Sequence, residues 1–227
     1  MDLACTGEDP PASAPVEVWC VDIEGCAPLE PRLSAVLDDH DRDRASRFVS
    51  PSDARRYRIA HGALRTILGR HIGIEPRRIR FVFGAHGKPL LRDGGPRFSL
   101  SHSGALALVA VSADRDVGVD VEEVRAISAA GTLAQRFFSP EEARKIADQP
   151  RGDRDRQFMR SWTAMEAVLK AEGTGLGAWE RSEADGMRAP IAGKPRWSVR
   201  RLDLASTHVG AVAAQGGNFT VRMRRFG

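Results

Sequence analysis

The sequence predicts an α/β protein built from two coarsely similar halves, each with β segments and one main helix. Short stretches with a period of two in hydrophobicity indicate strands, and two long stretches with apolar residues at helical spacing indicate the helices. The midpoint falls near residues 114–117, with no convincing internal sequence repeat. We therefore expect a frayed tail over residues 1–15, one half over 16–115 and a second over 116–227.

Composition and charge limit the classes of function. The 227 residues, 42% hydrophobic and 28% charged, are typical of a globular protein with a real core. No apolar run approaches a membrane span, and the N-terminus lacks the pattern of a signal peptide. Three cysteines without CxxC spacing fit a reduced, cytoplasmic protein without structural zinc. The net charge of +4 favours an anionic partner: a phosphorylated small molecule, an acidic protein or nucleic acid.

The first half begins with a predicted strand over 16–23 and a helix over 35–47. Ser50 precedes a second, longer helix that ends near Gly73, because a hydroxyl cap opens it and apolar residues recur at helical spacing. Three arginines, at 55, 56 and 58, crowd its first turns, where cations oppose the helix dipole. They indicate either an anion site or a solvated basic face.

Three further strands are predicted over 80–83, 97–100 and 105–112. The segment 86–89 reads as a turn that displays Lys88. Residues 101–104 (SHSG) read as a second turn, in which a histidine between two hydroxyls could hold a phosphate. A plain turn between strands is the alternative.

The strand over 117–123 (VGVDVEE) carries the candidate metal ligands. Its valines share one face and Asp120 and Glu122 share the other, because side chains alternate along a strand. Neighbouring carboxylates repel each other, and a hard cation such as Mg²⁺ relieves the repulsion. An edge strand with a solvated acidic face is the simpler explanation of the same pattern.

The second half continues with a helix start at Ser139, a polar loop over 149–155 and a helix from about Asp155 to Glu172. On a helical wheel Phe158, Trp162, Met165 and Leu169 form one apolar stripe, with Glu166 and Lys170 on its flank. These two charged residues are either site groups or a surface ion pair one turn apart. The last three β segments are expected over 197–204, 208–214 and 218–225.

These residues together resemble the 4′-phosphopantetheinyl transferases, specifically the longer, surfactin-synthetase-activating type. The resemblance spans about Arg44 to Leu176, and the final β segments match only in character. It rests on ordered motifs: GKP at 87–89, FSLSHSG at 98–104, GVDVE at 118–122, RFFS at 136–139 and WTAMEAVLK at 162–170, followed by GTGL at 173–176.

The resemblance implies a pseudo-dimeric α/β fold with the active site between the halves. It implies coenzyme A as donor, Mg²⁺ (or Mn²⁺) as cofactor, and transfer of phosphopantetheine to a serine of an acyl or peptidyl carrier protein, with release of adenosine 3′,5′-bisphosphate. The family's metal and acid–base positions match Asp120, Glu122 and Glu166. Glu166 is either a metal ligand or the base that takes the serine proton.

The family's phosphate ligands are implied for a further set of residues: Lys88, Ser101, His102 and Lys170, with Arg44 and Arg56 near the adenosine 3′-phosphate. Of these, His102 and Lys170 join Glu166 as the expected catalytic residues, because phosphoryl transfer depends on neutralised charge. One departure is Met165, where the family usually has lysine. The wheel predicts that Met165 packs in the core.

The expected partners are coenzyme A and an acidic carrier protein of polyketide or non-ribosomal peptide synthesis. The protein itself is expected to be a monomer that binds neither nucleic acid nor a membrane. The carrier is expected to dock near residues 131–147, with Phe137 or Phe138 in apolar contact; the alternative is that both rings are core. Two other functions remain open: a coenzyme A or carrier binder with weakened activity, and a basic nucleic-acid module. The second lacks an aromatic-rich basic strand.

Overall fold

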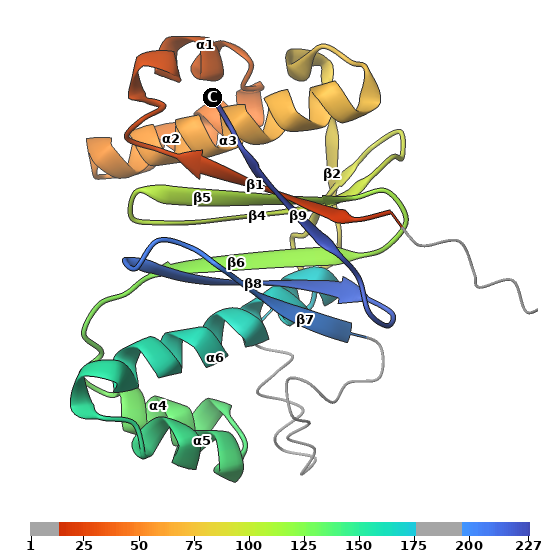
Figure 1. Cartoon of the computed structure of the whole chain (residues 1–227). Helices are drawn as coiled ribbons and strands as arrows, with labels where there is room; N and C mark the ends of the chain where they lie inside the picture. The colour runs from red at the N-terminus through yellow and green to blue at the C-terminus, as the bar shows by residue number, and fades with distance from the viewer. Residues whose placement is uncertain (1–13, 176–196) are drawn as a thin grey trace, which may run out of the picture.

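The computed structural model describes residues 14–175 and 197–227 of the chain. Two groups of helices enclose the β strands: α1 to α3 lie on one side and α4 to α6 on the other (Figure 1). Most of the predicted tail lies outside the described residues, as does the end of the glycine-rich segment after α6. Within the described residues no helix combines the length and hydropathy that a membrane crossing requires.

The first sheet has four strands in the order β4-β5-β1-β9. Their bounds are Val16–Asp22 for β1, Arg97–Ser103 for β4, Leu106–Ser112 for β5 and Val221–Arg225 for β9. Strand β9 comes from the end of the chain and pairs in parallel with β1, whereas the other pairs are antiparallel. The C-terminal segment therefore crosses from the second half of the sequence into the sheet of the first (Figure 1).

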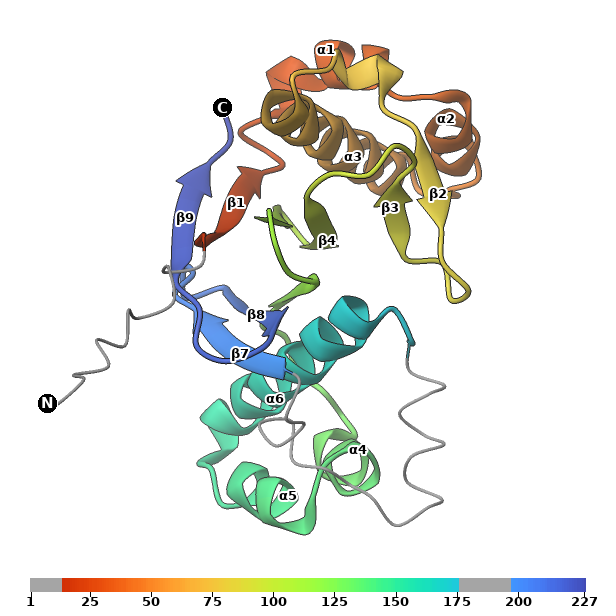
Figure 2. The same cartoon turned by 90° about the vertical axis from the view of Figure 1, so that its right-hand side faces the viewer.

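Three helices and a hairpin accompany this sheet. The helices are α1 (Glu30–Ala35), α2 (Asp39–Ser46) and α3 (Pro51–Ile72), with single 3₁₀ turns at Ala27–Leu29 and Pro76–Arg78. As predicted, Ser50 caps α3 by accepting a hydrogen bond from the Asp53 amide, and Gly73 ends it in the left-handed conformation. The hairpin of β2 (Phe81–Phe83) and β3 (Pro89–Leu91) lies on the far side of the molecule from β1 and β9 (Figure 2).

The second sheet has three antiparallel strands in the order β6-β8-β7. Strands β6 (Val117–Glu123), β7 (Trp197–Leu202) and β8 (His208–Gln215) follow the predicted segments closely, and the long helix α6 (Arg151–Glu172) packs on β6 and β8. Helices α4 (Ala130–Phe137) and α5 (Pro140–Ala147) pack against α6 at the end of the molecule (Figure 1).

The two sheets share one apolar core. The three valines predicted to share a face of β6 are at most 1% exposed, and they pack with residues from β1, β5 and β8. This face joins the halves and stabilises both, since apolar surface from each is removed from water at the same boundary.

Helix α6 approaches β6 more closely than a side chain would allow. A Cβ added at Gly118 would lie 2.0 Å from the carbonyl oxygen of Ala167 and 2.4 Å from the amide nitrogen of Ala171. Only glycine permits this backbone-to-backbone contact. It fixes where α6 crosses the sheet, and so where its polar flank lies.

A buried polar network connects α2 to α3. Asp41 of α2 is 3% exposed, and Arg65 of α3 is 1% exposed and donates from Nε to the Asp41 carboxylate at 2.6 Å. Arg65 also donates to the Ile79 carbonyl at 3.0 Å and pairs with Asp38, the N-cap of α2. Burial would raise the pKa of Asp41, but hydrogen bonds and charge from His61 and Arg65 lower it to about 2. The carboxylate is therefore ionised and paired in the folded protein.

Several boundaries differ from the sequence predictions. The segment 101–104 was expected to be a turn, but β4 continues through Ser103, because residues 101–103 pair with residues 106–108 of β5. The expected loop over 149–155 is wrong, since α6 begins at Arg151 directly after Pro150, which suits a helix start. Residues 130–137, for which no helix was predicted, form α4. The helix expected over 35–47 is shorter, α2 at Asp39–Ser46, and α1 ends at Ala35, where it was expected to begin.

Replacing Gly118 with alanine tests the close contact between β6 and α6. Because the new methyl meets backbone on α6, we expect Gly118→Ala to lower the free energy of unfolding by about 3 kcal/mol, at the upper end for overpacking. Gly152→Ala is the matched control, because nothing lies within 4 Å of its added Cβ on α6. The control should be neutral or stabilising by about 0.5–1 kcal/mol. Urea unfolding measures both, and equal effects would contradict the contact.

The Asp41–Arg65 pair predicts a specific pH dependence of stability. Asp41→Asn should destabilise the protein at pH 7 by about 2–3 kcal/mol, because buried Arg65 keeps Asp38 but loses one of its two carboxylate partners. Because folding lowers the pKa of Asp41, its ionised carboxylate stabilises the folded protein fully when the pH is above the unfolded-state pKa of 3.8. That stabilisation is lost as the pH falls from 3.8 toward 2. The wild-type advantage should therefore shrink by about 2 kcal/mol over this range. The exposed Asp39→Asn serves as control, and a pH-independent difference would contradict the pairing.

Candidate functional site

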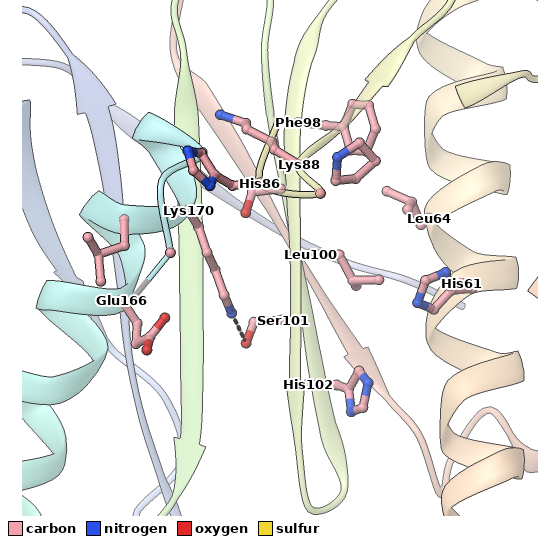
Figure 3. A pocket seen from close by; sticks show the side chains of 16 residues that line it. His61, Leu64, His86, Lys88, Phe98, Leu100, Ser101, His102, Glu166 and Lys170 are labelled. Carbon is pink, nitrogen blue, oxygen red and sulfur yellow. Dashed lines mark hydrogen bonds between the residues drawn. The ribbon is translucent and has the colours of Figure 1, made fainter. Parts of the chain in front are cut away.

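A cleft of about 450 Å³ lies between α3 and β4 on one side and α6 on the other. The segment 86–89 and Gly173 also line it. Figure 3 shows His61 projecting into it from α3, opposite Glu166 and Lys170 of α6. Five residues predicted from the sequence line this cleft: Lys88, Ser101, His102, Glu166 and Lys170.

Serine hydroxyls of β4 connect the first sheet to β6. Ser99 and Ser103 accept hydrogen bonds from the backbone amides of Val119 and Glu123, at 3.1 and 3.0 Å. Ser103 also donates to Glu122 at 2.9 Å. Serines two residues apart point to the same face of a strand, so the hydroxyls of Ser99, Ser101 and Ser103 all face β6. The hydrogen bonds between β4 and β6 described here are made by these serine side chains. These bonds cover the outer edge of β6 and place residues 101–103 beside the carboxylates of that strand.

Two residues that line the cleft, Lys170 and Ser101, both bind Asp120, which lies behind them and does not itself line the cleft. The Lys170 ammonium donates to Asp120 Oδ1 at 2.6 Å and to Ser101 Oγ at 2.9 Å, and Ser101 donates to the same carboxylate oxygen at 2.8 Å. Asp120 is 4% exposed, so the solvated acidic face is wrong for this residue. A buried carboxylate with a cation and a hydroxyl is a strongly polar group in a region of low dielectric.

Glu166 experiences the negative charge of the neighbouring carboxylates. Its pKa is raised, first by desolvation and then by Asp120 and Glu122, while Lys170 acts to lower it. The three carboxylates implied by the family resemblance are thus electrostatic neighbours. Their mutual repulsion is the condition that a divalent cation would relieve.

The residues present fit a divalent cation. The second oxygen of Asp120, Oδ2, is buried and has no hydrogen-bond partner among the described residues. An unpartnered buried acceptor is costly, and oxygen ligands of this kind suit Mg²⁺. Within residues 14–175 and 197–227, however, no three carboxylate, imidazole or thiol groups already lie together as a set of metal ligands. The convergence of Asp120, Glu122 and Glu166 on one ion therefore stays a prediction.

Lys88 lines the cleft but directs its ammonium into the protein. It donates to the carbonyl oxygens of Ala171, at 2.6 Å, and Val117, at 3.3 Å. Desolvation lowers the pKa of Lys88. The lysine therefore holds the end of α6 to the start of β6, where a cation also complements the helix dipole. Its expected contact with a phosphate requires the ammonium to turn from these carbonyls.

His102 keeps an exposed face at the cleft although much of its ring is desolvated. Its pKa is lowered to about 4 by that desolvation, and then by the positive charges of His61, Lys170 and Arg56. His102 is therefore neutral at pH 7 in the free protein. A bound phosphate would reverse the balance of charge around it.

The arginines of the first half occupy different environments. Arg55 and Arg58 pair with Glu24 and Glu30, and an anion-binding role for these two stays a prediction. Arg56 pairs with Asp53 on its own helix and influences His102. Arg44 is exposed on α2; neither it nor Arg56 lines the cleft.

Sequence analysis missed His61 and His86, which also line the cleft. A signal for His61 was available, because Tyr57, His61 and Arg65 recur every four residues along α3 and so share one side of the helix. No comparable pattern surrounds His86.

The burial of three apolar side chains decides two of the predictions. Phe137 and Phe138 are 8% and 2% exposed and belong to the core of α4, α5 and α6. Their proposed apolar contact with a carrier protein is therefore wrong, because neither ring is available at the surface. Met165 is 0% exposed in the same core, which confirms the prediction that it packs there.

Comparisons with known proteins give a consistent family. Residues 116–209 match the 4′-phosphopantetheinyl transferase superfamily model, and residues 30–114 match the 4′-phosphopantetheinyl transferase N-terminal model. The chain is 36% identical over 208 residues to the 4′-phosphopantetheinyl transferase HetI of Nostoc sp., covering 88% of each protein. It is 28% identical over 146 residues to the 4′-phosphopantetheinyl transferase Sfp of Bacillus subtilis, covering 64% of each.

Restoring the lysine that the family usually carries tests the packing of Met165. Because the position is sealed, Met165→Lys should lower the free energy of unfolding by about 3 kcal/mol or more, as for a charge buried without a partner. Met223→Lys is the matched control, since Met223 is 41% exposed. Thermal unfolding measures both. A Met165→Lys protein with wild-type melting temperature and faster turnover would show that the side chain reaches the cleft.

Proposed function

We propose a complete reaction for this chain, which belongs to the 4′-phosphopantetheinyl transferase superfamily. In this reaction the 4′-phosphopantetheine group of coenzyme A moves to a serine hydroxyl of an apo acyl or peptidyl carrier protein. The reaction depends on Mg²⁺ and releases adenosine 3′,5′-bisphosphate. That the chain is a 4′-phosphopantetheinyl transferase follows from the family and its relatives; the donor, metal and acceptor are the proposal.

One observation carries the proposal. The Lys170 ammonium is held between Ser101 and Asp120 at the wall of the cleft, beside a buried Asp120 oxygen that has no hydrogen-bond partner among the described residues. A fixed cation next to a free carboxylate oxygen is what a pyrophosphate with a divalent metal requires. The cleft of about 450 Å³ is of a size found for small-molecule sites.

The chain's own residues then have separable roles. Lys170 and Ser101 donate to the donor's phosphates, and His102 binds a phosphate oxygen from the β4 wall. Asp120 and Glu122 hold the metal, which when bound neutralises charge on the pyrophosphate. Lys88, Arg44 and Arg56 are proposed to add positive charge at the rim.

Glu166 is proposed as the base that takes the acceptor's serine proton. Its raised pKa supports this role, because a carboxylate that holds a proton more tightly is a better acceptor near neutral pH. The alternative is that Glu166 completes the metal site. The two roles differ in metal affinity, which Glu166→Gln should reduce only in the second.

The proposal also covers the division of the chain into two halves, its oligomeric state and its location in the cell. The two family matches meet near residue 115, which supports a division into halves over 16–115 and 116–227, with β9 returning to the first sheet. We propose the longer, pseudo-dimeric subtype acting as a cytoplasmic monomer. An acidic carrier suits the net charge of +4.

The central test measures transfer directly. Wild-type protein with coenzyme A, Mg²⁺ and a purified apo-carrier should increase the carrier's intact mass by one phosphopantetheine group. Asp120→Asn should reduce the rate about a hundredfold or more, as expected when a group that stabilises transferred charge is lost. Asp114→Asn is the control, because Asp114 is a half-exposed turn residue outside the cleft.

Removal of Mg²⁺ with a chelator should stop the wild-type reaction, and added Mg²⁺ should restore it. Wild-type protein that binds coenzyme A and carrier without any mass change would instead support a binding protein. Near-normal turnover by folded Asp120→Asn would remove Asp120 from the metal site.

A further inference from the structure

Three polar side chains form a stripe on α3 that faces Asp41. Tyr57, His61 and Arg65 are spaced four residues apart, so they lie on one side of the helix. Tyr57 donates to Asp41 Oδ1 at 3.3 Å, His61 Nδ1 lies 3.4 Å from the same oxygen, and Arg65 binds the other oxygen. One buried carboxylate therefore organises three side chains of α3.

This arrangement fixes the imidazole of His61 on two sides. Its Nδ1 edge faces the ionised Asp41, and its ring stacks on Tyr57 with the centroids 3.8 Å apart and the planes at 21°. The two contacts together hold the imidazole in one orientation. Fixed orientation of this kind is typical of a histidine that binds a ligand through its other nitrogen.

The free edge of His61 belongs to the cleft. Its side chain is 23% exposed and lines the cleft on the α3 wall, across from Lys170 (Figure 3). His61 and Arg56 both act on the pKa of His102, so the three groups are neighbours. Nε of Arg56 is buried and has no hydrogen-bond partner among the described residues. Arg56, which also pairs with Asp53, therefore places an unsatisfied hydrogen-bond donor close to this wall of the cleft.

We propose that His61 binds a phosphate group of the donor through Nε2, and that Asp41 is the positioning residue that holds its ring in place. The inference rests on the proposed function, because it assigns a further residue to the donor site. With donor bound, the imidazolium donates from Nδ1 to Asp41 and from Nε2 to a phosphate oxygen. The ring then donates a hydrogen bond to an anion at each of its two edges.

Two replacements of His61 separate the two edges of its ring. Asparagine places an amide near Nδ1 and retains the Asp41 contact, whereas glutamine places an amide near Nε2 and retains the ligand contact. His71→Asn is the matched control, since His71 lies on the same helix, pairs with Glu17 and does not line the cleft.

Calorimetric titration with coenzyme A should show affinity about tenfold weaker for His61→Asn, the loss expected for a hydrogen bond to a charged group. His61→Gln should retain most of the affinity, and His71→Asn all of it. In steady-state assays His61→Asn should raise KM for coenzyme A with kcat within about twofold of wild type, as for a lost binding contact.

Comparison of donors identifies the phosphate. A larger loss with coenzyme A than with dephospho-coenzyme A assigns His61 to the 3′-phosphate, and equal losses assign it to the pyrophosphate; both support the inference. The role of Asp41 is tested by a double-mutant cycle: Asp41→Asn should weaken binding in the wild type but not in the His61→Asn background.

Wild-type affinity in His61→Asn, or equal losses in the asparagine and glutamine variants, would overturn the inference. So would a His61→Asn protein with a lower melting temperature and unchanged affinity, because that pattern describes a purely structural residue. In each case wild-type transfer to the carrier would still stand. Wild-type protein that fails to bind coenzyme A would instead remove the proposed function itself.

Discussion

The close contact of α6 with β6 at Gly118 is the constraint on which the site depends. Because residue 118 has no side chain, the backbone of α6 at Ala167 and Ala171 rests directly on the strand. Glu166 and Lys170 then lie beside Asp120, two residues further along β6. A larger residue at 118 would lift the helix and separate the ammonium from the carboxylate. A single glycine thus couples the packing of the second half to its electrostatics.

The site brings together charges that the fold alone would not favour. A buried Asp120 oxygen without a described partner, and a Glu166 whose pKa is raised by other carboxylates, both cost stability in the free protein. Proteins retain such conflicts mainly at functional sites. The serines of β4 limit the cost, because their hydroxyls satisfy the outer edge of β6 without adding charge.

Most of the fold could be predicted from sequence, because periodicity reports local environment. The alternation over 117–123 gave the strand and its buried face, and the cap at Ser50 gave the start of α3. Contacts across the chain could not be predicted. The pairing of β4 with β6, the return of β9 and the orientation of His61 each depend on residues distant in sequence. Phe137 was misassigned because a hydrophobic pair before a helix is equally compatible with core and surface.

A structure determined with coenzyme A and Mg²⁺ bound would show whether the two walls of one cleft hold the donor between them. We expect the pyrophosphate beside Lys170 and Ser101, the metal on Asp120, and His61 within hydrogen-bond distance of a phosphate oxygen. Donor phosphates bound elsewhere, with Lys170 still paired only to Asp120 and Ser101, would contradict this expectation.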